Sequence, residues 1–166
     1  MRDLGLELVL AGGAAGLPTP EATAALLRAV AGLWETGEGR VIRPPGDGVL
    51  LLPERSYLPP GTLRQILLGI DGAAVADDRI HGALRSVTLD GVVGRVGGLD
   101  VERDWDDALS LEEQRLLGVA RALLTPPRFV LLDHLEVDIG PERAVETLEA
   151  LAALGIGCVV LGDETP

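Results

Sequence analysis

The stretch Trp105–His134 reads WDDALSLEEQRLLGVARALLTPPRFVLLDH, and its order of patterns decides the fold. Leucine, valine and alanine recur at helical spacing over Leu111–Leu124, which predicts a helix. The proline pair Pro126–Pro127 marks a junction after that helix, and the apolar run Phe129–Asp133 is typical of a strand buried on both faces. A long helix that leads into such a strand predicts an α/β fold with a parallel sheet.

The same alternation of strands and helices extends over the rest of the chain. Short apolar runs bounded by Gly or Pro predict the other strands, which we expect to be buried on both faces: Leu6–Ala11, Arg40–Arg43, Val49–Leu52 and Cys158–Gly162. Helical spacing predicts the other helices: Pro20–Trp34 with Thr19 as its N-cap, Thr62–Leu68, Asp78–Val87 and Pro141–Leu154.

The middle third of the chain, from Gly61 to Thr125, contains helical patterns but no convincing strand. We therefore expect one domain over residues 1–166. Its sheet core comprises residues 1–60 and 126–166, and residues 61–125 form an inserted helical subdomain. The sequence shows neither a transmembrane span nor a secretory signal peptide.

The charge of the chain excludes several classes of partner. Its 14 basic and 26 acidic residues give a net charge of −12, which repels phosphate backbones and anionic lipid surfaces. We therefore expect neither nucleic-acid binding nor direct lipid binding. All 14 basic residues are arginine, so no lysine is present for a Schiff base or for the phosphate-binding position of a P-loop.

A second stretch, Leu51–Gly69, reads LLPERSYLPPGTLRQILLG and precedes Trp105–His134 in the chain. Together with LLRAVAGLW at Leu26–Trp34, these segments resemble the ATP-binding cassette domain of ABC transporters. The resemblance is closest to the peroxisomal-type half transporters and their bacterial relatives. It implies a P-loop NTPase-like parallel sheet core with an inserted helical subdomain, and it implies ATP, Mg²⁺ and a transmembrane partner. It also implies a second nucleotide-binding domain as a partner.

The family's phosphate loop can be aligned with this chain in two ways. One alignment uses Leu17–Ala24 and places Thr23 where the family has lysine. The other starts at Gly12 and places Pro18 at the lysine, and it keeps strand, loop and helix in register. Either way the triphosphate loses a charge-assisted hydrogen bond worth about 1.5–3 kcal/mol. The candidate nucleotide-binding residues of this degenerate loop are Gly12, Gly13, Gly16, Thr19 and Thr23.

The Q-loop and signature positions are also substituted. The family's glutamine, which touches Mg²⁺, falls on Glu54, whose carboxylate could bind the metal. In the signature LSLEEQ, Ser110 is retained and Glu112 replaces the glycine that approaches the γ-phosphate on the opposite subunit. A carboxylate about 4 Å from a phosphate oxygen costs about 4 kcal/mol at an effective dielectric constant of 20.

The resemblance places the Mg²⁺-associated aspartate of Walker B at Asp133 and puts His134 where the family has its general-base glutamate. Imidazole can act as a base near neutral pH. The switch histidine falls on Asp163, which cannot donate a hydrogen bond when it is ionised. Asp133, His134 and Glu136 could be read as a metal trio, but we expect the first two side chains to point to opposite sides of the strand end.

These positions predict a degenerate cassette that binds ATP weakly or not at all, hydrolyses none and requires no cofactor. We expect it to dock on a transmembrane partner through the cleft around the Q-loop and Tyr57–Gly61, at the cytoplasmic side of the membrane. It could be the C-terminal part of a longer membrane transporter. Two alternatives are an active ATPase, in which Glu54, Asp133 and His134 hold Mg²⁺ and water, and a free-standing soluble interaction module.

Overall fold

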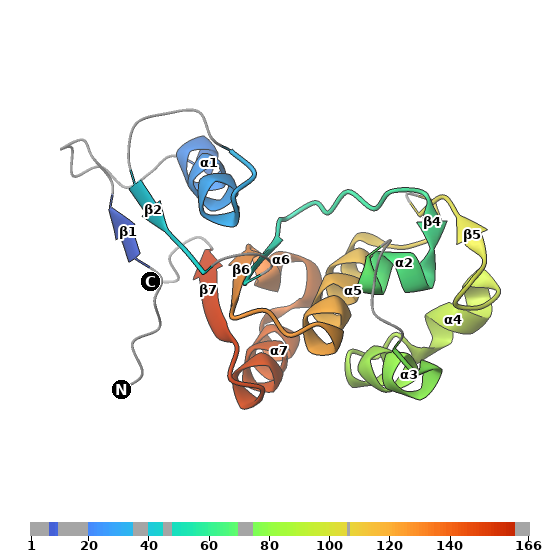
Figure 1. The fold of residues 1–166 in the computed structure, drawn as a ribbon. Helices are drawn as coiled ribbons and strands as arrows, with labels where there is room; N and C mark the ends of the chain where they lie inside the picture. The colour runs from blue at the N-terminus through green and yellow to red at the C-terminus, as the bar shows by residue number, and fades with distance from the viewer. Residues whose placement is uncertain are drawn as a thin grey trace.

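The computed structural model describes residues 7–9, 20–34, 40–44, 48–69, 75–105 and 107–161, which form an α/β fold (Figure 1). The elements in chain order are β1 (Glu7–Val9), α1 (Pro20–Ala31), β2 (Arg40–Ile42), β3 (Val49–Leu52), β4 (Gly61–Thr62), α2 (Leu63–Leu68), α3 (Asp77–Ser86), α4 (Asp90–Val96), β5 (Glu102–Arg103), α5 (Leu111–Leu124), β6 (Phe129–Asp133), α6 (Leu135–Ile139), α7 (Pro141–Ala153) and β7 (Gly157–Leu161).

The central sheet confirms the predicted fold class. Its three strands are parallel and lie in the order β3, β6, β7, with Val49 opposite Phe129 and Phe129 opposite Gly157. All three are almost uninterrupted apolar runs, as expected for parallel strands that are covered on both faces. None of the described helices is both long and apolar enough to cross a membrane.

Helices cover the middle strand, β6, on both faces. Leu131 packs with Leu27 and Val30 of α1, whereas Val130 and Leu132 belong to the larger core formed with α5, α6 and α7. This division follows from the alternation of side chains along a strand. Figure 1 shows α1 on one side of β6 and β7 and α7 on the other.

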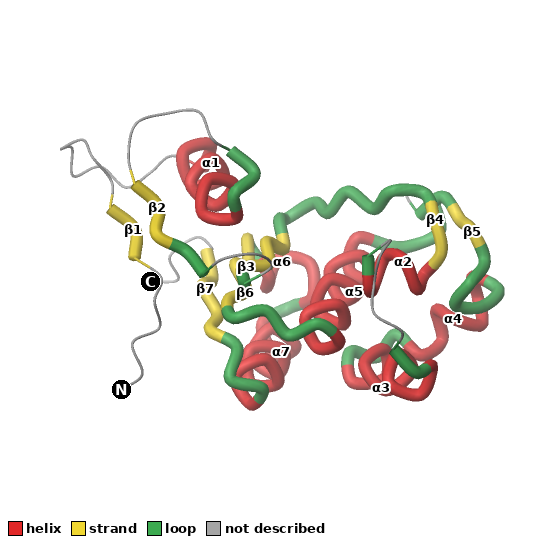
Figure 2. Tube along the Cα trace, viewed as in Figure 1, coloured by secondary structure: helices red, strands yellow, loops and turns green. Residues whose placement is uncertain are grey.

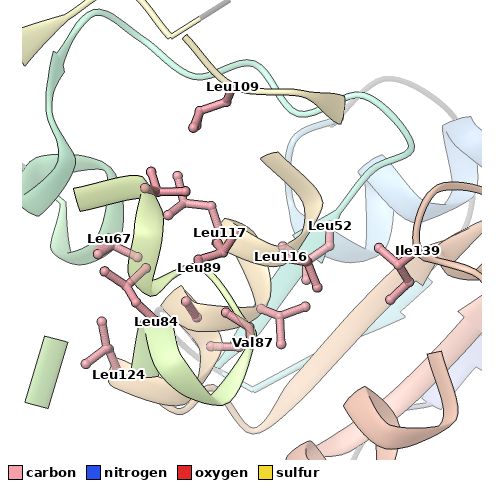
Figure 3. Packing of buried hydrophobic residues seen from close by; sticks show 14 of the residues in the cluster. Leu52, Leu67, Leu84, Val87, Leu89, Leu109, Leu116, Leu117, Leu124 and Ile139 are labelled. Atoms are coloured by element: carbon pink, nitrogen blue, oxygen red, sulfur yellow. The ribbon is translucent and has the colours of Figure 1, made fainter. Parts of the chain in front are cut away.

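The helices α2 to α5, together with β4 and β5, lie at one end of the molecule, and α1, β1 and β2 lie at the other (Figures 1 and 2). The same large apolar core continues from β6 into this helical end, where Leu84, Leu89, Leu117 and Leu124 lie close together (Figure 3). Trp105 is fully buried there, and its Nε1 donates to the carbonyl of Gly61 at 3.1 Å. The helical and sheet parts therefore share one continuous core.

Two expectations about strands are wrong. First, β1 and β2 pair antiparallel in a separate sheet, and Val41 and Ile42 of β2, which are consecutive and so point to opposite faces, are both exposed. Second, the middle third contains β4 and β5, which pair antiparallel with Gly61 opposite Arg103. Each of these strands has only two residues, which is too short for a periodic sequence signal.

The helix predictions differ from the structure mainly at their ends. The bounds of α5 are as predicted, whereas α1 ends at Ala31 because Gly32 adopts φ +79°. Thr62 is the N-cap of α2 rather than its first residue. Two helices, α4 and α6, were not predicted at all. The sequence DGVVGRV of α4 contains two glycines, and α6 has only five residues.

Candidate functional site

The end of β6 carries Asp133 and His134, which are in direct contact. His134 adopts φ +50°, leaves the strand and forms the N-cap of α6. Its Nδ1 lies 2.8 Å from Oδ1 of Asp133, and both side chains are largely shielded from solvent. The expectation that the two side chains point to opposite sides is therefore wrong, because strand alternation ends where φ becomes positive. In the tautomer that carries its hydrogen on Nδ1, the imidazole donates a hydrogen bond to Asp133, which orients the ring.

The other predicted metal ligands, Glu54 and Glu136, lie on the segments that follow β3 and β6. Glu54 follows β3 and is exposed, and Glu136 lies in the first turn of α6. Nowhere in the part of the chain that the structure describes do three His, Cys, Asp or Glu side chains gather as metal ligands. Glu54 follows the end of β3, and Asp133 is the last residue of β6. Because these strands are adjacent and parallel, both residues lie at the carboxyl-terminal edge of the sheet.

A buried arginine occupies this edge of the sheet. The side chain of Arg115, on α5, is 2% exposed. Its Nε donates to Oδ2 of Asp138 at 2.9 Å, and its Nη1 donates to the carbonyl of Leu52 at 3.0 Å. Nη1 also donates to the carbonyl of Pro53, and Nη2 donates to the carbonyl of Asp133. One guanidinium thus links α5 to the ends of β3 and β6 and to α6.

The first turn of α5 is fixed by a capping box. The Oγ of Ser110 accepts from the backbone N–H of Glu113 at 3.2 Å, and the Glu113 carboxylate accepts from the Ser110 N–H at 2.9 Å. Arg95 of α4 donates to both Glu113 oxygens, at 2.8 and 2.7 Å. Burial raises the pKa of Glu113, but the hydrogen bonds from Arg95 and Ser110 outweigh it, so this pKa lies below its ordinary value.

A second arginine binds the neighbouring carboxylate. Nη1 of Arg143, in the first turn of α7, donates to Oε1 of Glu112, and Nη2 donates to Oγ1 of Thr88. Thr88 adopts φ +60° in the turn between α3 and α4. The two carboxylates that follow Ser110 are therefore each held by an arginine from a different helix. Each carboxylate is therefore neutralised, and both arginines are already engaged by a carboxylate.

A cavity of about 220 Å³ lies between β3, the segment after it, α2 and α5. Leucine side chains of β3 and α5 form much of its lining, with Ile66 of α2. Two of its lining residues, Leu33 and Tyr57, are 71% and 78% exposed. Arg121 of α5 also lines the cavity. The cavity is thus apolar inside and bordered by large, exposed apolar side chains.

The chain is 36% identical over 146 residues to an uncharacterized ABC transporter ATP-binding protein of Synechocystis sp., which covers 87% of this chain and 22% of that protein. It is 33% identical over 148 residues to the lysosomal cobalamin transporter ABCD4 of Mus musculus, covering 82% of this chain and 24% of the transporter. A bacterial Atm1-family ABC exporter with ATP bound has the same fold, with a TM-score of 0.65 over 85% of this chain and 27% of that one at 21% identity. The chain belongs to the ATP-binding cassette family.

No protein-family model matches the chain. It spans about a quarter of the length of the relatives named above. The structure describes Thr23, which lies within α1 rather than in a loop. The other phosphate-loop candidates and the switch position lie outside the described residues: Gly12, Gly13, Gly16, Thr19 and Asp163.

Sequence reasoning missed the arginines of the cassette. Arg95, Arg115 and Arg143 contact residues 13 to 63 positions away in the chain, and such contacts leave no local pattern. Arg115 did carry one signal. It shares a buried stripe of α5 with Val119 and Ala122, where an arginine is unexpected unless it has partners.

Proposed function

We propose that this cassette keeps the family fold, binds ATP weakly or not at all, hydrolyses none, and serves as a docking domain for a transmembrane partner. The observation that carries the proposal is the start of α5. Glu112 stands at the position that approaches a γ-phosphate in the family, and an arginine of the same chain already holds its carboxylate. A phosphate at this point would have to compete with a carboxylate for an arginine that is already paired, so the position offers it no cation of its own.

The phosphate loop supports the same conclusion. Because the chain contains no lysine, neither alignment can supply the family's cation. The start of α1 at Pro20 supports the alignment from Gly12, since Thr23 is already helical. A loop without this cation loses a charge-assisted hydrogen bond worth about 1.5–3 kcal/mol. The domain boundaries that we propose are those given above, with residues 61–125 as the helical subdomain.

The cavity beside β3 is the docking site that we propose for the transmembrane partner. Tyr57 and Leu33 are the exposed apolar side chains at this cavity, and burying one of them stabilises a complex by about 1.5–3 kcal/mol. Both relatives named above are ABC transporter proteins, and one is a lysosomal transporter. We therefore place the cassette at the cytoplasmic side of a membrane, held there by its partner, and a second cassette would join it head to tail.

The docking proposal can be tested with the transmembrane half that is encoded in the same or the neighbouring reading frame. We expect Tyr57→Ser and Leu33→Ser each to weaken its binding about tenfold or more, measured with the purified proteins in detergent. Val145→Ser, on the exposed face of α7, is the matched control and should leave binding unchanged. Equal affinities for all three variants and the unsubstituted chain would exclude this cavity as the docking site.

One observation favours a second candidate function, an ATPase with a rearranged site. The Asp133–His134 contact resembles the pairing of a carboxylate with a general-base imidazole. This candidate predicts Mg²⁺-dependent phosphate release that His134→Ala abolishes and that His81→Ala, on α3, does not change. We expect no phosphate release above background from any of the three proteins. Turnover that depends on His134 would replace the first proposal with this one.

A further inference from the structure

The cassette family implies Mg²⁺, but the described residues at the carboxyl edge of the sheet do not fit it. Mg²⁺ keeps several of its waters and is bound through one or two carboxylates together with phosphate oxygens. Oδ1 of Asp133 is engaged by His134, and Glu54, the other candidate carboxylate, is exposed. The nearby carbonyls of Leu52, Pro53 and Asp133 all accept hydrogen bonds from Arg115. Oxygens that could attract a divalent cation are therefore already in use.

We infer that the guanidinium of Arg115 is the resident cation of this edge and that the edge keeps its structure without a divalent metal. A guanidinium stays charged at every accessible pH and offers five donors in a fixed plane. Four oxygen atoms surround this one: three carbonyls and the Asp138 carboxylate. They come from the end of β3, the end of β6 and α6, so one cation holds three segments.

Burial makes this arrangement unusual for a simple structural arginine. The side chain of Arg115 is 2% exposed and that of its partner Asp138 is 14% exposed. A buried charge is tolerated only when hydrogen bonds compensate for the water that it has lost. At Arg115 most of that compensation comes from strand-end carbonyls, which are the oxygens at the edge where the family places its metal-associated residues. A divalent cation added there would have to displace the guanidinium from the carbonyl oxygens that it already holds.

The first test measures metal binding by the purified 166-residue chain with Mn²⁺ as the probe. Free Mn²⁺ is followed by electron paramagnetic resonance, and the melting temperature is compared in EDTA and in Mg²⁺. We expect no saturable Mn²⁺ binding and melting temperatures that agree within the error of the measurement. Saturable binding that Asp133→Asn abolishes would overturn the inference. This test does not depend on docking or on ATP, so its failure is distinct from that of the proposed function.

The second test asks whether the positive charge itself holds the edge. Arg115→Met should lower the melting temperature by about 10 °C, because it leaves the Asp138 carboxylate and three carbonyls without their donor. Arg115→Lys should be more stable than Arg115→Met, because it keeps the charge. Arg121→Met, an exposed arginine of the same helix, is the control and should not melt earlier. The inference fails if the Lys variant is no more stable than the Met variant.

Discussion

At the scale of single residues, the cassette's site is determined by which charges neutralise one another. The sequence predicted Asp133 at the end of a strand and Ser110 at the start of a helix, because each residue belongs to a local pattern. The orientation of His134 could not, since it depends on one positive φ that the sequence does not signal. The partners of Arg115 were equally hidden, because they lie up to 63 positions away and meet only in the folded chain.

Close packing within the sheet gives a prediction at the same scale. A Cβ added at Gly157 of β7 would lie 2.7 Å from the ring of Phe129 on β6, and this ring is buried. We expect Gly157→Ala to lower the free energy of unfolding by about 1–3 kcal/mol through overpacking, measured by urea denaturation.

The matched control for that substitution is Gly82→Ala in α3. Apart from its chain neighbours and its own helix backbone, no atom lies within 4 Å of a Cβ built at Gly82, which is helical. Its replacement should raise the free energy of unfolding by about 0.5–1 kcal/mol. If Gly157→Ala left the free energy of unfolding unchanged, the contact between Gly157 and the ring of Phe129 would be looser than 2.7 Å to a Cβ implies.

At the scale of secondary-structure elements, α5 shows what periodicity and capping can predict. Its bounds, Leu111–Leu124, follow from the apolar spacing and from Ser110 at the N-cap, and the structure confirms them. In contrast, the antiparallel direction of β1 and β2 could not be predicted, because a short apolar run does not encode the direction of its partner. Elements of two to five residues, such as β4 and α6, carry too little pattern to be recognised.

The capping box of α5 predicts a pH dependence of stability. The pKa of Glu113 is lower in the folded chain than its ordinary value, so its ion pair with Arg95 stabilises the fold above that ordinary value, about 4.3. This contribution is lost as the pH falls through the folded-state pKa. Glu113→Gln should therefore be less stable than the unsubstituted chain at pH 7, and the difference should shrink as the pH falls below about 4.

Urea denaturation of both proteins at several pH values measures this difference. Glu149→Gln, on the exposed face of α7, is the control for removing one negative charge from a chain of net charge −12. A difference between Glu113→Gln and the unsubstituted chain that is the same at all pH values would contradict the role given to the ion pair.

At the scale of the whole molecule, the cassette combines the architecture of its family with a net charge of −12 and with arginine as its only basic residue type other than histidine. The sequence predicted the parallel sheet and the helices on both faces, because buried strands and amphipathic helices have strong patterns. It also predicted that a cation would be missing from the phosphate loop, since no lysine is present. Only the structure shows that arginines hold the carboxylates at the start of α5.

We propose that the cassette binds ATP weakly or not at all. The most direct test is isothermal titration calorimetry of the 166-residue chain with ATP and Mg²⁺, combined with thermal unfolding in the same solutions. We predict no saturable heat at ATP concentrations up to about 1 mM and no change in melting temperature. At 1 mM ATP, a dissociation constant of 10 µM would stabilise the chain by about 2.7 kcal/mol, which a melting curve detects readily. Micromolar ATP binding with such a shift would contradict the proposal that this cassette binds ATP weakly or not at all.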